Sequence, residues 1–138
     1  MKCKEEKHYY ESGQLYRHYF VDENHNEYGE FRSYYKSGKL RWHYLNRSDA
    51  IFGEAKMFNE DGTLWNHYLV DGKGKGKVKE IANVIEFGKP DTHSEEELIQ
   101  IAKDNNLPLL SELPKAEVER TLWYLKHPDM PCLPITST

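Results

Sequence analysis

The chain has 138 residues, which is enough for one domain or for one domain with a small appendage. Only 38% of the residues are hydrophobic, but ten Tyr, five Phe and three Trp supply large rings for a core, which argues against a disordered chain. The formal net charge of −4 disfavours a general nucleic-acid binder, and no apolar run reaches the roughly 18–20 residues that a membrane span needs.

The amino-terminal residues and the cysteines indicate a cytoplasmic protein. The first seven residues, MKCKEEK, carry charge without an apolar core, so they do not resemble a signal peptide. Cys3 and Cys132 lie near opposite ends of the chain and belong to no CxxC or Cys/His cluster. We expect both to be free, reduced thiols, as is usual in the cytosol.

A hairpin-like unit recurs three times in the first part of the chain. The copies read YYESGQLYRHY, YYKSGKLRWHY and FNEDGTLWNHY, and they begin at residues 9, 34 and 58. Each copy contains one dipeptide typical of a two-residue turn: Ser12-Gly13, Ser37-Gly38 and Asp61-Gly62. Glycine accepts the positive φ of a tight turn, and the flanking Tyr, Phe and Leu favour strands.

These units predict an antiparallel β-meander of six to eight strands over residues 3–87, because a single hairpin is only marginally stable and must pack beside others. Gly76-Lys77-Val78 resembles the start of a partial fourth copy. We therefore expect an α+β fold, with a β-repeat sheet over residues 1–87 and a helical cap with an extended tail over residues 88–138.

The repeat follows the pattern Gly-x-x-x-x-Tyr-x-x-x-Gly-x-Leu. Two copies carry it, through Gly29, Tyr34, Gly38 and Leu40, and through Gly53, Phe58, Gly62 and Leu64. This pattern resembles the MORN-type repeat, in the variant form common in bacterial antitoxin-like proteins. The resemblance covers somewhat more than half of the chain. It implies a curved, single-layer sheet that serves binding, and it implies no particular partner.

Side chains alternate along a strand, so two-residue turns would divide the sheet into two faces. Face A is expected to hold Tyr10, Leu15, Tyr19, Phe31, Tyr35, Leu40, Trp42, Tyr44, Met57, Leu64 and Tyr68. Face B is expected to hold Tyr9, Tyr16, Tyr34, Phe58, Trp65, Lys7, Arg32, Lys56, His18, His43, His67, Glu5, Glu30 and Glu54. Face A is the more apolar, so we expect it to be the covered face.

One repeat position on face B holds three histidines: His18, His43 and His67. They would lie two strands apart, roughly 9.5 Å, whereas a zinc ion needs ligands at about 2.0–2.1 Å, so we expect no metal site. The same row would hold three further cations: Lys7, Arg32 and Lys56. Such a row could bind phosphates or an acidic protein. Alternatively, the neighbouring glutamates neutralise it by cross-strand pairing.

The rest of the chain differs in composition. Residues 71–76 are rich in glycine and lack the GxxxxGK[ST] motif, so they predict a loop, and residues 78–87 have strand character. Ser94 and Glu97 form a capping box for a helix that ends near Asn105-Asn106-Leu107-Pro108. A second helix is expected from about Pro114 to Lys126, followed by an extended tail, and its inward stripe would be Val118, Thr121, Leu122 and Leu125.

We expect these helices to cap the repeat array. The alternative is that they project from it and expose a dimer or partner surface formed by Leu109, Leu110, Leu113, Trp123 and Tyr124.

The sequence favours a non-catalytic protein-binding module without a cofactor, because Tyr, Trp and Arg on a rigid sheet are typical of interface hot spots. The candidate partner-binding residues are Tyr9, Tyr16, His18, Arg32, Tyr34, Arg41, His43, Lys56, Phe58, Trp65 and His67. The likeness to antitoxin-like proteins suggests a class of partner, a toxin or nuclease that the chain restrains, without identifying the partner itself. A phage-encoded inhibitor of a defence protein would look similar, and a homo-oligomer stays open.

Two alternatives belong to other classes. The cationic row with its tyrosines could bind nucleic acid or phosphate, with bases stacked on the rings. A small nuclease using His43 with Glu30 or Glu54 is disfavoured, because a catalytic pair should be singular whereas these residues recur in every copy. The chain also lacks a GxSxG nucleophile motif.

Overall fold

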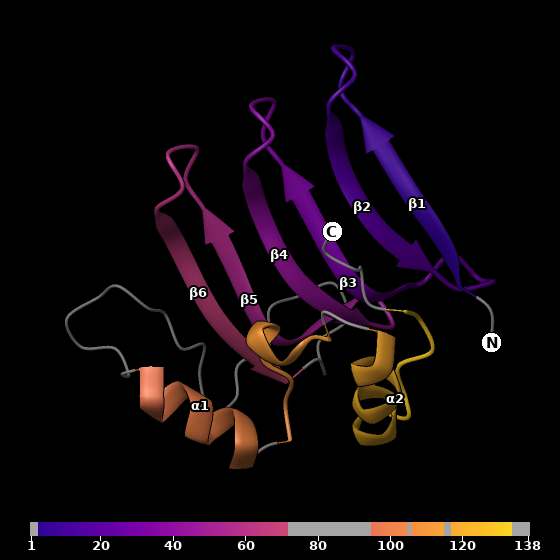
Figure 1. Cartoon of the computed structure of the whole chain (residues 1–138), viewed down its shortest axis with the longest axis vertical. Coiled ribbons are helices and arrows are strands. Elements are labelled where there is room, and N and C mark those ends of the chain that lie inside the picture. The colour runs from indigo at the N-terminus through magenta and orange to yellow at the C-terminus, as the bar shows by residue number, and fades with distance from the viewer. Residues whose placement is uncertain (1–2, 72–94, 105, 115–116, 134–138) are drawn as a thin grey trace.

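The computed structural model describes residues 3–71, 95–104, 106–114 and 117–133 (Figure 1). In these residues a six-stranded antiparallel sheet is followed by two α-helices, which confirms the predicted α+β meander. The predicted strand at 78–87, the partial fourth copy and the boundary at residue 87 lie outside the described residues.

The strands pair in sequence order, so β1 and β6 form the two edges of the described sheet. The strands are β1 (Lys4–Tyr9), β2 (Leu15–Val21), β3 (Glu27–Tyr34), β4 (Leu40–Arg47), β5 (Ala50–Phe58) and β6 (Leu64–Asp71). The helical elements are α1 (Glu95–Asp104), the 3-10 helix η1 (Leu110–Glu112) and α2 (Glu117–Lys126). None of the described helices is long and apolar enough to cross a membrane.

The hairpin turns are one residue longer than predicted. In the first hairpin the amide of Gly13 donates to the carbonyl of Tyr10 and the amide of Tyr10 donates to the carbonyl of Gln14, both at 2.9 Å. The same two bonds close the other two hairpins. The three loops end at Gly13, Gly38 and Gly62, whose φ values of 97°, 90° and 94° lie in the left-handed region that glycine accepts. This is a type I turn followed by a bulge, a common three-residue hairpin loop.

The longer loop shifts the register beside each turn. Tyr9 pairs with Leu15 and not with Tyr16, and the equivalent pairs are Tyr34 with Leu40 and Phe58 with Leu64. Paired residues share a face, so these three leucines lie on face B, and their assignment to face A is wrong. The residues that the pairing skips at the bulges are Tyr16, Arg41 and Trp65.

Beyond the bulges, the predicted register of face B is confirmed. Lys7 pairs with His18, which pairs with Arg32, and the ladder continues in the same way to the last strand. The complete row across β1 to β6 is Lys7, His18, Arg32, His43, Lys56 and His67.

The prediction that face A is the covered face is wrong. The largest core cluster joins Leu45, Phe52 and Leu69, which lie on face B at the strand ends away from the hairpin turns, to the C-terminal residues. The buried C-terminal members are Ala102, Leu107, Leu109, Leu110, Leu113, Trp123 and Met130. The sheet and the C-terminal segment therefore share one core, and Leu109, Leu110, Leu113 and Trp123 are not an exposed surface.

On face A, aromatic rings of neighbouring strands shield one another from water. Tyr19, Phe31 and Tyr44 stack across three neighbouring strands, with ring centroids 5.5 and 4.7 Å apart. Each ring thus removes surface from water on its neighbour. On face B, Leu45 and Leu69 are buried against leucines of the C-terminal segment, at the strand ends away from the hairpin turns.

Helix α1 ends where the sequence predicts. Asn106 adopts a positive φ of 53°, and the amide of Leu107 donates to the carbonyl of Ala102 at 2.8 Å, which satisfies a terminal carbonyl.

The predicted inward stripe of the second helix is wrong. Leu122 and Leu125 of α2 are 60% and 73% exposed, whereas Trp123 is buried. Trp123 belongs to the core cluster, and its ring stacks on His127, one turn later, at 4.5 Å.

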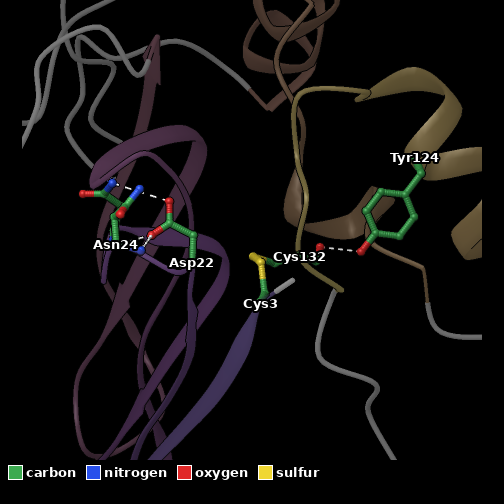
Figure 2. Close-up of a disulfide and its surroundings, with 6 residues drawn as sticks. Cys3, Asp22, Asn24, Tyr124 and Cys132 are labelled. Atoms are coloured by element: carbon green, nitrogen blue, oxygen red, sulfur yellow. Dashed lines mark hydrogen bonds between the residues drawn. A yellow bond between two sulfur atoms is a disulfide. The ribbon is translucent and has the colours of Figure 1, made fainter. Parts of the chain in front are cut away.

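Cys3 and Cys132 form a disulfide, so the prediction of free thiols is wrong (Figure 2). Their Cα atoms lie 5.4 Å apart, although 129 residues separate them in the sequence. The start of β1 and the C-terminal segment meet at the same end of the sheet, and this proximity exists only in the folded chain (Figure 1).

Candidate functional site

Face B carries a repeated pairing of glutamate with histidine. The Nε2–carboxylate distances are 3.5 Å for His18 and Glu5, 2.9 Å for His43 and Glu30, and 2.5 Å for His67 and Glu54. Each pair lies within one hairpin, with the glutamate on its first strand and the histidine on its second. We call them the Glu–His pairs.

Two of the other three cations of the row, Lys7 and Arg32, also pair with these glutamates. Arg32 Nη2 lies 3.3 Å from Glu30 Oε1, and Lys7 Nζ lies 3.3 Å from Glu5 Oε1. This is the cross-strand and same-face pairing that the neutralisation alternative predicts. The cationic row is therefore balanced by carboxylates of its own face.

The carboxylates of the second and third Glu–His pairs are much more enclosed than that of the first. Glu5 is half exposed, Glu30 is buried and Glu54 is 5% exposed. Glu54 Oε1 accepts a hydrogen bond from the amide of Leu110 at 2.7 Å, and the Glu54 amide donates to the carbonyl of Pro108 at 3.0 Å. The C-terminal segment thus closes directly over the third pair.

The electrostatics of Glu54 combine two opposing effects. Burial alone raises the pKa of its carboxyl, because it disfavours the charged form. The hydrogen bond from His67, the charge of Lys56 and the amide of Leu110 outweigh burial, so the pKa of Glu54 lies below its usual value. Glu54 is therefore a buried, ionised group at the junction of the sheet and the C-terminal segment.

Two glycines let the C-terminal segment approach the sheet closely. Gly53 has a φ of +87°, and a Cβ at this residue would lie 2.4 Å from the carbonyl oxygen of Pro108. A Cβ at Gly29 would lie 3.2 Å from Cβ of Cys132. The sequence marks Gly29-Glu30 and Gly53-Glu54 as repeated dipeptides, but their role in docking becomes visible only with the tertiary structure.

The hairpin end of face B is apolar and stays outside this cover. We call its six residues the tip strip: Tyr9, Leu15, Tyr34, Leu40, Phe58 and Leu64. Tyr9 is 59% exposed, and Trp65, which follows the strip at the last bulge, is 58% exposed. The described helices lie at the opposite end of the strands (Figure 1).

The predicted partner-binding residues therefore fall into three groups. Tyr9, Tyr34 and Phe58 belong to the tip strip. The row brings together the three histidines, Arg32 and Lys56, and among the described residues all of these except Lys56 pair with a glutamate. His67 is buried. Tyr16 and Arg41 meet at the bulges, where the Arg41 guanidinium lies 5.5 Å from the Tyr16 ring and 4.2 Å from the Trp42 ring.

Sequence reasoning missed the three leucines of the tip strip. The signal that could have placed them is the loop itself, because the glycine follows two polar residues in every copy: ESG, KSG and EDG. A glycine in third position fits the type I turn with a bulge, and that turn places each leucine on face B.

Face A carries a separate open pocket of about 360 Å³ near the β2–β3 and β4–β5 loops. Three carboxylates, Glu6, Glu27 and Asp49, line it together with His8 and His25. Burial and the negative charge of Asp49 raise the pKa of Glu27. Within the described part of the chain, no group of three or more His, Cys, Asp or Glu side chains is arranged to hold a metal ion.

Comparisons of the chain with protein-family models, with curated proteins and with solved structures give no match. The tip strip and the Glu–His pairs are thus the features from which a function can be proposed.

Proposed function

We propose that the chain is a non-catalytic protein-binding module that contacts its partner through the tip strip and Trp65. The observation that carries the proposal is the exposure of large apolar side chains at the hairpin end of the sheet, above all Tyr9 in the tip strip and Trp65 at the last bulge. Tyrosine and tryptophan dominate the energy of protein interfaces, because each ring buries a large area with few rotatable bonds.

The tip strip is also held rigid, which favours binding. Tyr10 Oη donates to the carbonyl of Tyr34, and Tyr35 Oη donates to the carbonyl of Phe58, both at 2.7 Å. Each bond ties one hairpin to the next directly at a residue of the strip. A surface ordered before binding loses less conformational entropy when a partner docks.

The pairing of the cationic row supports a protein partner over nucleic acid. Phosphates would have to compete with Glu5 and Glu30 for Lys7 and Arg32, and two of these four groups are largely enclosed. Catalysis by a Glu–His pair is disfavoured for a related reason. Glu54 and His67 lie under the C-terminal segment, and equivalent pairs recur in the other hairpins.

The resemblance to MORN-type antitoxin-like proteins supplies the class of partner. We propose a toxin, a nuclease or a host defence protein that this chain restrains by covering part of its surface.

The test is affinity capture with full-length chain from a native lysate of the organism that encodes it. The wild-type chain should retain one stoichiometric protein. The double variant Tyr9→Ala, Trp65→Ala should lose it, since each hot-spot side chain contributes about 1–2 kcal/mol or more to binding. Leu125→Ala, which removes an even more exposed apolar side chain from α2, is the matched control and should bind as wild type.

Retention of the partner by the double variant would contradict the proposal, as would capture of abundant nonspecific proteins alone. A parallel titration with short RNA and DNA at low and high salt tests the nucleic-acid alternative. We expect no binding even at low salt, whereas a basic binding surface would give a steep salt dependence.

A further inference from the structure

The disulfide joins the start of β1 to the last described residues of the chain. Cys3 directly precedes β1, and Cys132 is 1% exposed. We call residues 131–133 the strap. Figure 2 shows the Cys3–Cys132 bond beside Tyr124, whose hydroxyl donates to the carbonyl of Cys132.

The strap covers a small apolar area of the sheet. Cys132 packs with Phe20 of β2, and Cys3 and Tyr28 border the same cluster. Gly29 of β3 lies directly under Cys132. Opening the strap would therefore expose the β2–β3 end of face B.

A second stretch of the C-terminal segment, Pro108–Leu110, packs on β5 and is held in a different way. There the Pro108–Leu110 stretch is fixed by two hydrogen bonds to Glu54 and by the close approach to Gly53. Its leucines also belong to the main core cluster, as does Met130, which immediately precedes the strap. The strap itself is the part of the C-terminal segment that has a covalent bond to the sheet and belongs to the smaller cluster.

We propose that the Cys3–Cys132 disulfide is a redox-operated clasp that keeps the strap on β2 and β3. In the opening step a dithiol reductant delivers two electrons and two protons. The S–S bond breaks, Cys3 and Cys132 become thiols, and the dithiol closes to its own disulfide. Met130 stays in the main core and acts as the hinge, so the sheet and the Pro108–Leu110 dock keep their structure.

The physical basis is the length of chain that the bond closes. Cys3 and Cys132 are 129 residues apart in sequence, and the bond holds the strap beside β1 at a high effective concentration. After reduction the strap depends on the packing of one small side chain and on the Tyr124 hydrogen bond. Its local opening then becomes much more frequent.

The proposed clasp also relates to the redox state of the compartment in which the protein acts. Stable disulfides belong to oxidising compartments, whereas a bond that opens under reduction suits a protein that responds to its redox surroundings. This inference is independent of the proposed binding function, because the tip strip lies at the other end of the strands.

The experiment is hydrogen exchange of the full-length chain, with and without dithiothreitol, read by mass spectrometry. Reduction should lower the protection of peptides covering residues 20–30 and 128–133 by about tenfold or more. Peptides covering residues 52–58 and 107–113 should keep their protection. Cys3→Ser should reproduce the reduced pattern without reductant and should not respond to dithiothreitol, which shows that the effect passes through this bond.

Three results would each contradict the proposal. The first is that the purified, unreduced chain carries two free thiols, as measured by intact mass and native-state alkylation. The second is that the oxidised and reduced chains show the same exchange pattern. The third is that reduction lowers protection in every strand, because the bond would then stabilise the whole fold and not the strap alone. Cys132→Ser, which also breaks the bond but alters a buried position, should give the same regional pattern as Cys3→Ser.

Discussion

Glu54 shows how a single residue connects the sheet to the C-terminal segment. Its carboxylate accepts hydrogen bonds from His67 on β6 and from the amide of Leu110, so one buried charge serves two elements. A buried carboxylate without such partners would protonate instead of paying the desolvation cost. The lowered pKa of Glu54 indicates that here the partners prevail.

This pKa predicts a pH dependence of stability. The folded-state pKa of Glu54 lies below its reference value of 4.5, so the folded state binds the proton less readily than the unfolded state does. The carboxylate's contribution is therefore complete well above pH 4.5 and is lost as the pH falls below that value through the folded-state pKa. Urea unfolding of the wild type should show a stability loss in this acid range.

Glu54→Gln should remove about 1.5–3 kcal/mol of stability at pH 7, because it replaces hydrogen bonds to a charged group. It should also flatten the acid dependence. Glu60→Gln, in an exposed turn, is the control and should leave both quantities unchanged. An acid dependence of Glu54→Gln as steep as that of the wild type would rule out this role.

At the scale of elements, the hairpins are joined by a bond that the repeat itself encodes. Tyr10 and Tyr35 occupy the same repeat position, and each hydroxyl reaches the backbone of the following hairpin. The third copy has Asn59 at this position. The tyrosine is therefore present where another described hairpin follows, and the bond adds to the ordinary pairing between strands.

Tyr35→Phe should weaken the coupling between the second and third hairpins. Losing one hydroxyl–carbonyl hydrogen bond should cost about 0.5–1.5 kcal/mol in urea unfolding. Tyr9→Phe removes a hydroxyl from an exposed ring and should change stability much less. Equal losses in the two variants would show that the Tyr35 hydroxyl contributes nothing specific.

The two α-helices show which helix features a local sequence pattern can predict and which it cannot. The end of α1 follows from Asn106 and Pro108, since Asn accepts a positive φ and proline disfavours helix continuation. The buried side of α2 does not follow from periodicity, because Leu122 and Leu125 form the more regular apolar stripe and are exposed. The position of Trp123 in the core decides the orientation of this helix.

At the scale of the whole molecule, the sheet and the C-terminal segment form one structure because glycine permits backbone contact. Gly53 brings Pro108 against β5 and aligns Leu110 with Glu54. The cluster behind this contact holds large apolar side chains of both parts, and each fully buried one contributes about 1.5–3 kcal/mol relative to exposure. The docked segment therefore belongs to the fold of the sheet.

Gly53→Ala tests this contact against a matched variant. A methyl group there would lie 2.4 Å from the Pro108 oxygen, in a backbone conformation that already disfavours alanine by about 1–2 kcal/mol. Gly62→Ala carries the same conformational penalty at a φ of +94°, but its added Cβ meets no atom within 4 Å. Gly53→Ala should therefore destabilise the chain clearly more in urea unfolding.

Gly53→Ala should also lower the exchange protection of the Leu110 amide, because its acceptor, the Glu54 carboxylate, moves relative to it. Gly62→Ala should not. Identical behaviour of the two variants in both measurements would mean that close approach at Gly53 does not hold the C-terminal segment in place.

The sequence by itself determined the features that depend on neighbouring residues. Recurring glycine turns and strand residues predicted the meander, and the spacing of Lys7, His18 and Arg32 predicted a row that the pairing confirms. Alternation along a strand is a local property, so it survives folding unchanged. The turn length escaped prediction, because a glycine after two polar residues fits two kinds of hairpin loop.

Only the tertiary structure decided which face is covered and which cysteines meet. The burial of Leu45 and Leu69 depends on leucines of a distant segment. The bond between Cys3 and Cys132 likewise requires the two ends of the described chain to meet. Contacts between remote residues depend on the whole folded chain, so no local pattern around either cysteine could predict them.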